Sequence, residues 1–238
     1  MWCLFLFHIF YFCSLALIAS KYPMKNSKAL LATSFFAPIQ YYSKLIQYPE
    51  ITIEQWENYS KQSYRNRCNI LGANGVLPLS IPVAKATNKK VLTKDVKISH
   101  DTNWQKLHWK GIEAAYKSSP FYEYYIDDLE RFFTQKWNYL LEYNNEIQKE
   151  IFGILEIEPN IHFTDDFIEF GPNEFDDFRE IIHPKASKSE TDNAFIANKY
   201  TQVFGDKFGF IENLSILDLI FNLGPDSLNY LESSITKR

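Results

Sequence analysis

The chain is poor in glycine, with eight residues in 238. It contains none of the patterns G-x-G-x-x-G, G-x-x-x-x-G-K-[ST], G-x-S-x-G and H-E-x-x-H. These patterns mark dinucleotide-binding turns, phosphate-binding loops, hydrolase nucleophiles and zinc proteases. Their absence argues against the best-recognised nucleotide-dependent and hydrolytic classes. The five histidines show no compact ligand spacing either, so the sequence predicts no metal site and indicates no particular cofactor.

Cysteine is also scarce, with three residues, and Cys3 and Cys13 lie in an apolar run from Trp2 to Ala19. No Lys or Arg precedes this run, so the basic segment of a signal peptide and the charge that orients a membrane anchor are both missing. A buried-strand pattern begins shortly after Met24. We therefore expect translation to start at Met24, with 1–23 an upstream extension or leader and 24–238 the domain.

On that expectation Cys68 is the one remaining cysteine and has no internal disulfide partner. This is typical of a reducing compartment, so we expect a cytoplasmic protein without stable membrane insertion. A membrane-anchored or exported protein is the alternative if residues 1–23 are genuine.

Acidic residues are absent from 58–94, which holds seven Lys and Arg, whereas 121–180 holds sixteen acids and four bases. The net charge of -4 therefore averages a basic segment and an acidic one. Nucleic acid is not an expected partner, because the acidic half would repel a long polyanion. One small anion at the basic segment is compatible with this distribution.

Hydrophobic periodicity and turn signals predict a single mixed α/β domain. Its sheet core includes a hairpin near 64–83, turned at Gly72-Ala73-Asn74-Gly75, and a helical subdomain is inserted near 102–155. The other expected strands cover 29–36, 51–53, 96–99 and 161–163, and 165–193 is expected to be irregular. The expected helices cover 39–47, 102–117, 119–134, 137–155 and a short apolar segment from Ser215 to Gly224-Pro225. Capping boxes are predicted at Thr102 with Gln105 and at Ser215 with Asp218, and Ser119-Pro120 is a further start signal.

Two arginines in the predicted hairpin are candidates for binding an anion. If 64–71 is a strand, its period of two places Arg65 and Arg67 on one face. Two adjacent guanidinium groups suit phosphate or carboxylate, because each can form two parallel hydrogen bonds. The alternative is that both arginines pair with acids of the protein itself.

Three residues are candidates for chemistry, each with a structural alternative. Cys68 follows the arginine pair, which would favour its thiolate, although a lone cysteine is more often a small buried residue. His108 lies on the predicted inner face of a helix, where it is either a core residue or a general base beside a cleft. Asp218 is in the first turn of a buried helix, where capping is the simpler role.

Several blocks of the sequence resemble the WbqC-like family. They are Phe36-Ala37-Pro38-Ile39-Gln40-Tyr41-Tyr42, Lys61 to Cys68, Leu79 to Val83, Trp104 with His108-Trp109, Ala115-Tyr116, Ser119-Pro120-Phe121, His183-Pro184-Lys185 and Asn213 to Asp218. The resemblance covers about 36–225 and implies a link to bacterial surface-polysaccharide (O-antigen) genes, with some relatives similar to aminoacyl or acyl transferases. It adds pocket candidates to the residues above, namely Gln40, Lys61, Tyr64, Asn66, His183 and Lys185.

The resulting hypothesis is a transferase that moves an aminoacyl, acyl or glycosyl group to an amino or hydroxyl acceptor. Arg65 and Arg67 would hold the phosphate of a small-molecule or carrier-bound anionic substrate. His108 would be the base, with Cys68 as an optional acyl relay. The alternative is a non-enzymatic glycan- or anion-binding protein of the same pathway.

Overall fold

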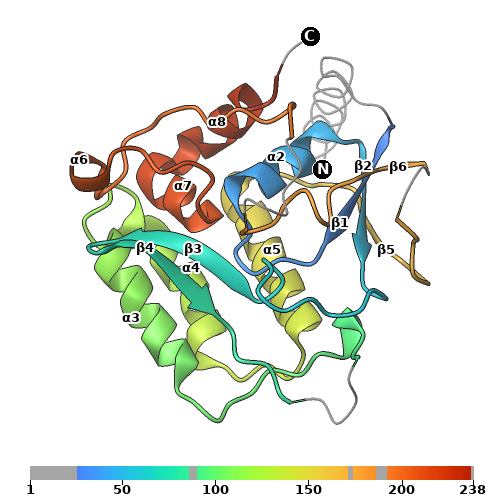
Figure 1. Ribbon diagram of the computed structural model, residues 1–238. Helices are drawn as coiled ribbons and strands as arrows, with labels where there is room; N and C mark the ends of the chain where they lie inside the picture. Colours follow the sequence, from blue (N-terminus) through green and yellow to red (C-terminus); the bar gives the residue numbers. More distant parts are fainter. Residues whose placement is uncertain (1–25, 86–89, 171–173, 186–191, 237–238) are drawn as a thin grey trace, which may run out of the picture.

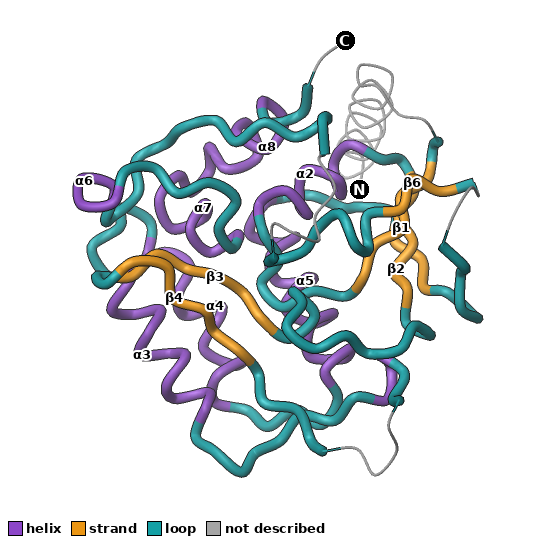
Figure 2. The backbone as a smooth tube through the Cα atoms, viewed as in Figure 1, coloured by secondary structure: helices purple, strands orange, loops and turns teal. Residues whose placement is uncertain are grey.

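The computed structural model describes residues 26–85, 90–170, 174–185 and 192–236. The predicted extension at 1–23 lies outside these ranges and stays a prediction. A four-stranded parallel sheet and a separate antiparallel hairpin lie in different parts of one mixed α/β domain, as the sequence predicts (Figures 1 and 2). In the order β5-β2-β1-β6, the strands of the parallel sheet are Ile161–Phe163, Glu50–Glu54, Lys28–Ala32 and Phe175–Asp177.

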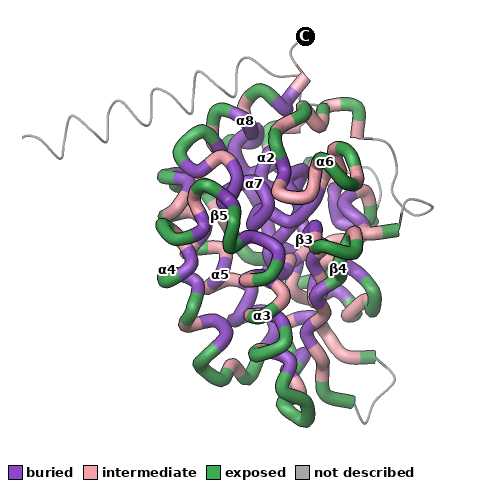
Figure 3. The backbone as a smooth tube through the Cα atoms, turned by 90° about the vertical axis from the view of Figure 1, so that its left-hand side faces the viewer, coloured by how far each residue is buried: buried purple, intermediate pink, exposed green. Residues whose placement is uncertain are grey.

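Strand β1 is a continuous apolar run because the sheet is covered on both faces. Ala29, Leu30 and Leu31 are each at most 1% exposed. The helix that follows, α2 (Ile39–Gln47), begins after Pro38 and ends before Pro49, with the bounds that the sequence predicts. All nine of its residues are buried, and Figure 3 shows α2 as a buried segment in the interior.

Strand β6 lies inside the segment 165–193 that was expected to be irregular. It pairs in parallel with β1, on the side opposite β2. Its sequence, Phe-Asp-Asp, carries no apolar run, so its strand conformation depends on the pairing with β1. Because of this pairing, the chain that follows β6 lies beside the chain that follows β1.

The hairpin consists of β3 (Arg67–Gly72) and β4 (Gly75–Ser80), and the predicted turn between them is confirmed. The predicted strand over 64–66 is wrong, because these residues form a turn before β3. The predicted strand over 96–99 is wrong as well. That segment makes isolated bridges, Val83 with Ile98 and Lys97 with Tyr139, beside the short helix η1 (Thr93–Asp95).

Three helices lie between β4 and β5 in the chain, as predicted: α3 (Trp104–Tyr116), α4 (Tyr122–Thr134) and α5 (Leu140–Leu155). Their predicted starts are wrong. Neither Asn103 before α3 nor Phe121 before α4 caps its helix with a side chain. The amide of Gln105 instead donates to the carbonyl oxygens of Phe132 and Gln135. It joins α3 to the end of α4 rather than closing a capping box.

The C-terminal segment contains α6 (Gly205–Phe208), α7 (Ile216–Leu223), η2 (Gly224–Asp226) and α8 (Ser227–Ser233). Ser215 caps α7 as predicted, because its hydroxyl accepts from the Leu217 amide. The predicted capping box with Asp218 is not completed, because the Ser215 amide donates to the Asn69 carbonyl oxygen instead. Residues 216–222 are all buried, which confirms the inference from their apolar pattern. No helix within the described residues has the length and apolar character that crossing a membrane requires.

Candidate functional site

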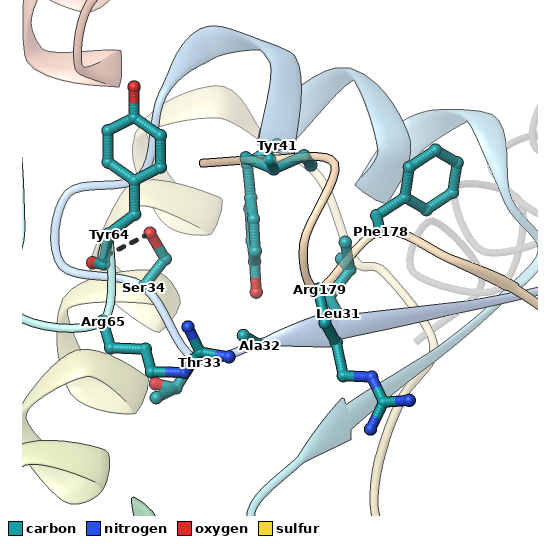
Figure 4. Close-up of a pocket in the computed structure, with 10 residues that line it drawn as sticks. Leu31, Ala32, Thr33, Ser34, Tyr41, Tyr64, Arg65, Phe178 and Arg179 are labelled. Atoms are coloured by element: carbon teal, nitrogen blue, oxygen red, sulfur yellow. Dashed lines mark hydrogen bonds between the residues drawn. The ribbon is translucent and has the colours of Figure 1, made fainter. Parts of the chain in front are cut away.

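A small recess lies at the carboxyl ends of β1 and β6, with about 10 Å³ of space, which is room for about one water-sized group. Its lining residues come from 31–34 at the end of β1, from Tyr41 of α2, from Tyr64 and Arg65 before β3, and from Phe178, Arg179 and Ile182 after β6 (Figure 4). In open α/β sheets, ligands bind outside the carboxyl ends of the strands, where adjacent strands continue in different directions. The recess therefore occupies the position where this architecture places a ligand.

Hydroxyl groups provide part of the polar lining. Thr33 accepts a hydrogen bond from Asn144 of α5, and Ser34 donates to the Tyr64 carbonyl oxygen. The hydroxyl of Tyr41 accepts one long bond of 3.5 Å from Gln148. In Figure 4 this hydroxyl points into the space toward which the Arg65 side chain is directed. The Tyr41 hydroxyl therefore has hydrogen-bonding capacity left for a ligand.

The turn between β1 and α2 fixes Tyr41 relative to the end of the strand. Phe36 in this turn has a φ of 37°, which is an unfavourable conformation for a bulky residue. The conformation is held from outside, because the Ser215 hydroxyl donates to the Phe36 carbonyl oxygen at 2.8 Å. Backbone strain of this kind persists only where the surroundings determine it, as they do here.

Arg65 forms a buried ion pair with Glu57. Its Nε and Nη2 atoms donate to the two carboxylate oxygens at 2.5 and 2.6 Å. The side chains are 3% and 5% exposed. The third guanidinium nitrogen, Nη1, makes no hydrogen bond to the described residues. The ion pair thus holds the Arg65 side chain in place and leaves its Nη1 group able to donate to a ligand.

Arg179 is the second arginine of the recess, and each of its three guanidinium nitrogens donates a hydrogen bond. Nε and Nη2 donate to Asp177, with the shortest distance 2.6 Å. Nη1 donates to Glu54 at 3.3 Å and to the Ile168 carbonyl oxygen at 2.8 Å. The guanidinium also lies 4.0 Å from the ring centroid of Phe170. Arg179 is therefore held in place by its partners. It lines one side of the recess, and the positive charge of its guanidinium group is compensated by Asp177 and Glu54.

Glu54, the last residue of β2, binds Arg179 and is completely buried. Its carboxylate accepts from the Trp56 amide at 2.7 Å, the Thr164 hydroxyl at 2.9 Å and the Ile168 amide at 2.9 Å, in addition to Arg179. A buried carboxylate is tolerated when its oxygens are fully hydrogen-bonded. Glu54 thereby sets the position of the Arg179 side chain.

Arg67 differs from both arginines of the recess. It lies in β3, is half-buried, and donates from Nε to the Ser80 hydroxyl at 3.0 Å. No ion pair to a described acid is formed by Arg67. Both Arg65 and Arg67 act electrostatically on the Tyr59 hydroxyl, whose pKa burial raises to about 12. The two arginines are two residues apart in the chain, but Arg65 lies in a turn and Arg67 in β3, so the predicted common strand face does not exist.

His108, predicted as a general base, is 7% exposed and packs against aromatic rings. Its ring centroid is 5.2 Å from that of Trp104 and 6.0 Å from that of Phe35. Burial lowers its pKa to about 4, against the raising effect of a hydrogen bond with the Ser80 backbone. His108 does not line the recess. His108 lies on the buried face of α3, as predicted, whereas its neighbour Leu107 is 67% exposed.

Cys68 and Asp218 are likewise buried and absent from the lining of the recess. Burial raises the pKa of the Cys68 thiol, and a hydrogen bond with Ser215 opposes this. The Asp218 carboxylate accepts from Tyr200 at 2.5 Å and from Gln202 at 2.9 Å. Burial raises the pKa of Asp218, and these bonds oppose the rise. The geometry accounts for both residues as parts of the interior.

The remaining predicted residues lie in separate places. Gln40 of α2 exchanges hydrogen bonds with Asn213 and donates to Asp192 at 2.9 Å. Asn66 donates to the Ile81 carbonyl oxygen. Lys61 and Lys185 are exposed, and buried His183 accepts at Nδ1 from the Lys185 amide. Of the predicted set, the structure brings only Tyr64 and Arg65 into the recess.

Sequence reasoning missed Thr33, Ser34, Tyr41 and Arg179 as recess residues. A signal existed for the first two, since polar residues that follow a buried parallel strand lie at the ligand-binding edge of a sheet. Tyr41 belongs to the block Phe36 to Tyr42 and was not singled out. Among the described residues there is no group of three or more His, Cys, Asp or Glu that could hold a metal ion.

The fold and the recess define an α/β protein with a polar site at the carboxyl edge of an open parallel sheet. The model of the WbqC-like protein family matches residues 33–184, which is more than half of the chain. The chain therefore belongs to the WbqC-like protein family, as the motifs indicate. No solved structure matches it.

Two curated proteins show how far the likeness extends. An uncharacterized protein of Mycobacterium tuberculosis is 23% identical over 229 residues, which cover 86% of this chain and 97% of that protein. The heat-inducible transcription repressor HrcA of Fusobacterium nucleatum is 25% identical over 191 residues, which cover 76% of this chain and 51% of the repressor. The chain thus matches one relative along nearly its whole length and the other along about half.

Proposed function

We propose that this chain is a transferase of bacterial surface-polysaccharide or related biosynthesis, and that its small-molecule or carrier-bound substrate binds in the carboxyl-edge recess. The observation that carries this proposal is the convergence of Tyr41, Ser34 and the unoccupied Nη1 of Arg65 at the end of β1. A few fixed polar groups in a concave site orient a ligand. Membership of the family supports the assignment to group transfer.

Arg67 is the best-placed group for an anionic part of the substrate. It lacks an acidic partner among the described residues and lies two residues after Arg65 in the chain. An unpaired guanidinium can bind phosphate or carboxylate through two hydrogen bonds. Lys61 lies nearby in the chain, is exposed, and adds positive charge.

A second candidate function is non-enzymatic binding of a glycan or anion. The burial of both His108 and Cys68 favours it, because neither reaches the recess. In the transferase, acceptor activation therefore requires either a group of the substrate itself or a hydroxyl at the recess. Transfer of a labelled acyl or sugar group to an amine or hydroxyl acceptor, followed by mass spectrometry, separates the two functions.

The site is tested by binding measurements on matched tyrosine variants. Nucleotide-sugars, coenzyme A thioesters and simple sugars are screened by thermal shift, since a ligand that binds the folded state raises its stability. For a compound that binds, Tyr41→Phe removes one hydrogen-bonding group and is expected to weaken affinity about tenfold. Tyr42→Phe is the control, because Tyr42 is the next buried tyrosine of α2 and does not line the recess.

Equal affinity of both variants and the wild type would place the ligand elsewhere and contradict the proposed site. Loss of binding in Tyr42→Phe as well would mean that the substitutions disturb α2 as a whole, and it would contradict a specific contact of the ligand with Tyr41. The proposal requires a loss in Tyr41→Phe alone.

A further inference from the structure

Two arginines line the recess, but the net charge of these arginines and the acids that pair with them is not positive. Arg65 and Arg179 carry two positive charges, while their partners Glu57, Asp177 and Glu54 carry three negative ones. The formal charge of the five groups is therefore -1. Four of the five side chains are at most 5% exposed, and Asp177 is 19% exposed.

The pairing is tight enough to persist when a ligand enters. Glu57 takes two of the three guanidinium nitrogens of Arg65, and Asp177 takes two of those of Arg179. Bidentate pairs of this kind are the strongest ion pairs in proteins, and removal of one partner leaves a costly buried charge. A ligand would have to break such a pair to use the full charge of either arginine.

We infer that the recess is charge-compensated: it takes one uncharged hydroxyl group of the substrate and excludes phosphate, with Glu57 as the residue that sets this preference. The inference rests on the proposed function for the location of the ligand. It assigns the anionic part of the substrate to a place outside the recess, toward Arg67.

The hydrogen-bonding groups of the recess suit one neutral hydroxyl group. Arg65 Nη1 can donate to a hydroxyl oxygen, while the Tyr41 hydroxyl can both donate and accept. A doubly charged phosphate would instead be desolvated against two arginines whose charge three carboxylates already compensate, and the remaining attraction would not offset that cost.

The charge of the recess can be changed at Glu57. Glu57→Gln keeps the size of the side chain and removes the carboxylate, so that Arg65 becomes available to an anion. About 10 mM inorganic phosphate is expected to raise the melting temperature of this variant by about 3 °C more than that of the wild type, where phosphate can bind only outside the recess at Arg67, at matched ionic strength. Glu146→Gln is the matched control, because Glu146 also pairs with an arginine, Arg131, away from the recess.

Glu57→Gln leaves the buried Arg65 guanidinium without its negatively charged partner, so this variant can fail to fold. Asp177→Asn is therefore the second variant, since Asp177 is partly exposed and Arg179 retains Glu54. It should gain phosphate stabilisation in the same way. Stabilisation of the wild type by phosphate to the same extent as the variants would overturn the inference. So would variants that fold and show no gain over Glu146→Gln.

Neutral sugars form the other arm of the experiment. Saturation-transfer NMR with glucose and N-acetylglucosamine should detect binding to the wild type that Tyr41→Phe reduces and Tyr42→Phe retains. Absence of sugar binding, together with phosphate stabilisation of the wild type that Arg67→Ala retains, overturns the inference. Binding of both sugars in Tyr41→Phe at the wild-type level contradicts the proposed site itself, so the two failures are distinguishable.

Discussion

The Lys44 ammonium group lies 2.7 Å from the Asp192 carboxylate, and the two side chains are 0% and 6% exposed. Lys44 also donates to Gln47 at 3.2 Å and lies 5.1 Å from the centre of the Phe178 ring. Phe178 is one of the residues that line the recess. This buried ion pair therefore connects α2 both to residue 192 and to the segment that follows β6.

Replacing Lys44 should destabilise the protein more than its single charge suggests. Lys44→Met leaves the Asp192 carboxylate buried without its cation, which typically costs about 3 to 5 kcal/mol. Lys44→Met combined with Asp192→Asn should recover much of that loss, because the asparagine can still accept from Gln40. Urea denaturation measures the free energy of unfolding of all three proteins.

The control for this cycle is Lys149→Met, since Lys149 pairs with Glu146 and is 69% exposed. An exposed pair contributes about 1 kcal/mol or less. Equal losses of unfolding free energy in Lys44→Met and Lys149→Met would contradict the conclusion that Lys44 and Asp192 form a buried ion pair.

Substitution by alanine should lower the free energy of unfolding at Gly224 and raise it at Gly153. Gly224 has a φ of +53°, and a Cβ atom there would lie 2.4 Å from the Phe121 ring. Gly224→Ala is therefore expected to lower the free energy of unfolding by about 2 kcal/mol or more. Gly153 lies in α5 with open space around it, so Gly153→Ala should raise stability by roughly 0.5 to 1 kcal/mol.

Thermal or urea unfolding of both alanine variants tests this difference. Phe121→Ala in the Gly224→Ala background should restore part of the loss if the ring is the cause. A neutral Gly224→Ala would contradict the close approach of Phe121 to the end of α7.

Local signals in the sequence predict the elements whose limits they define. Pro38 and Pro49 bracket α2, Asn74-Gly75 turns the hairpin, and Ser215 begins α7, and each of these is found in the structure. Such signals act through backbone dihedral angles and nearest neighbours, so they operate without tertiary contacts. The inserted helices were found in the same way, apart from their starts.

The recess depends on contacts that no local signal encodes. Strand β6 has a polar sequence and becomes a strand because it pairs with β1, more than 140 residues earlier in the chain. That pairing brings Arg179 beside Arg65. The prediction that Arg65 lies beside Arg67 on a strand assumed an extended conformation over 64–66, where the chain forms a turn to place Arg65 on Glu57.

Cys68 should be unreactive toward thiol reagents in the folded protein. It is 0% exposed, and burial raises the pKa of its thiol, so both access and thiolate formation are suppressed. Iodoacetamide at mildly alkaline pH should label Cys68 slowly in buffer and fast in denaturing urea. Peptide mapping by mass spectrometry separates Cys68 from Cys3 and Cys13, and rapid native labelling of Cys68 would support the acyl-relay hypothesis instead.

His108 should make the protein less stable as the pH falls below the ordinary range of histidine. Its folded pKa is lowered to about 4 from 6.5. Above pH 6.5 neither state binds the proton, whereas between these two values the unfolded state binds it and the folded state does not. The free energy of unfolding therefore falls through this window by up to about 3 kcal/mol, and below pH 4 the loss is complete.

Carboxylates titrate in the same range, so the contribution of His108 is the difference between the wild type and His108→Gln. The glutamine can still donate to the Ser80 backbone and has no titrating group. Urea denaturation at several pH values should show the two proteins diverging below pH 6.5, with the wild type losing more stability. Parallel curves would mean that His108 becomes protonated in the folded state near its usual pKa, which would restore it as a candidate general base.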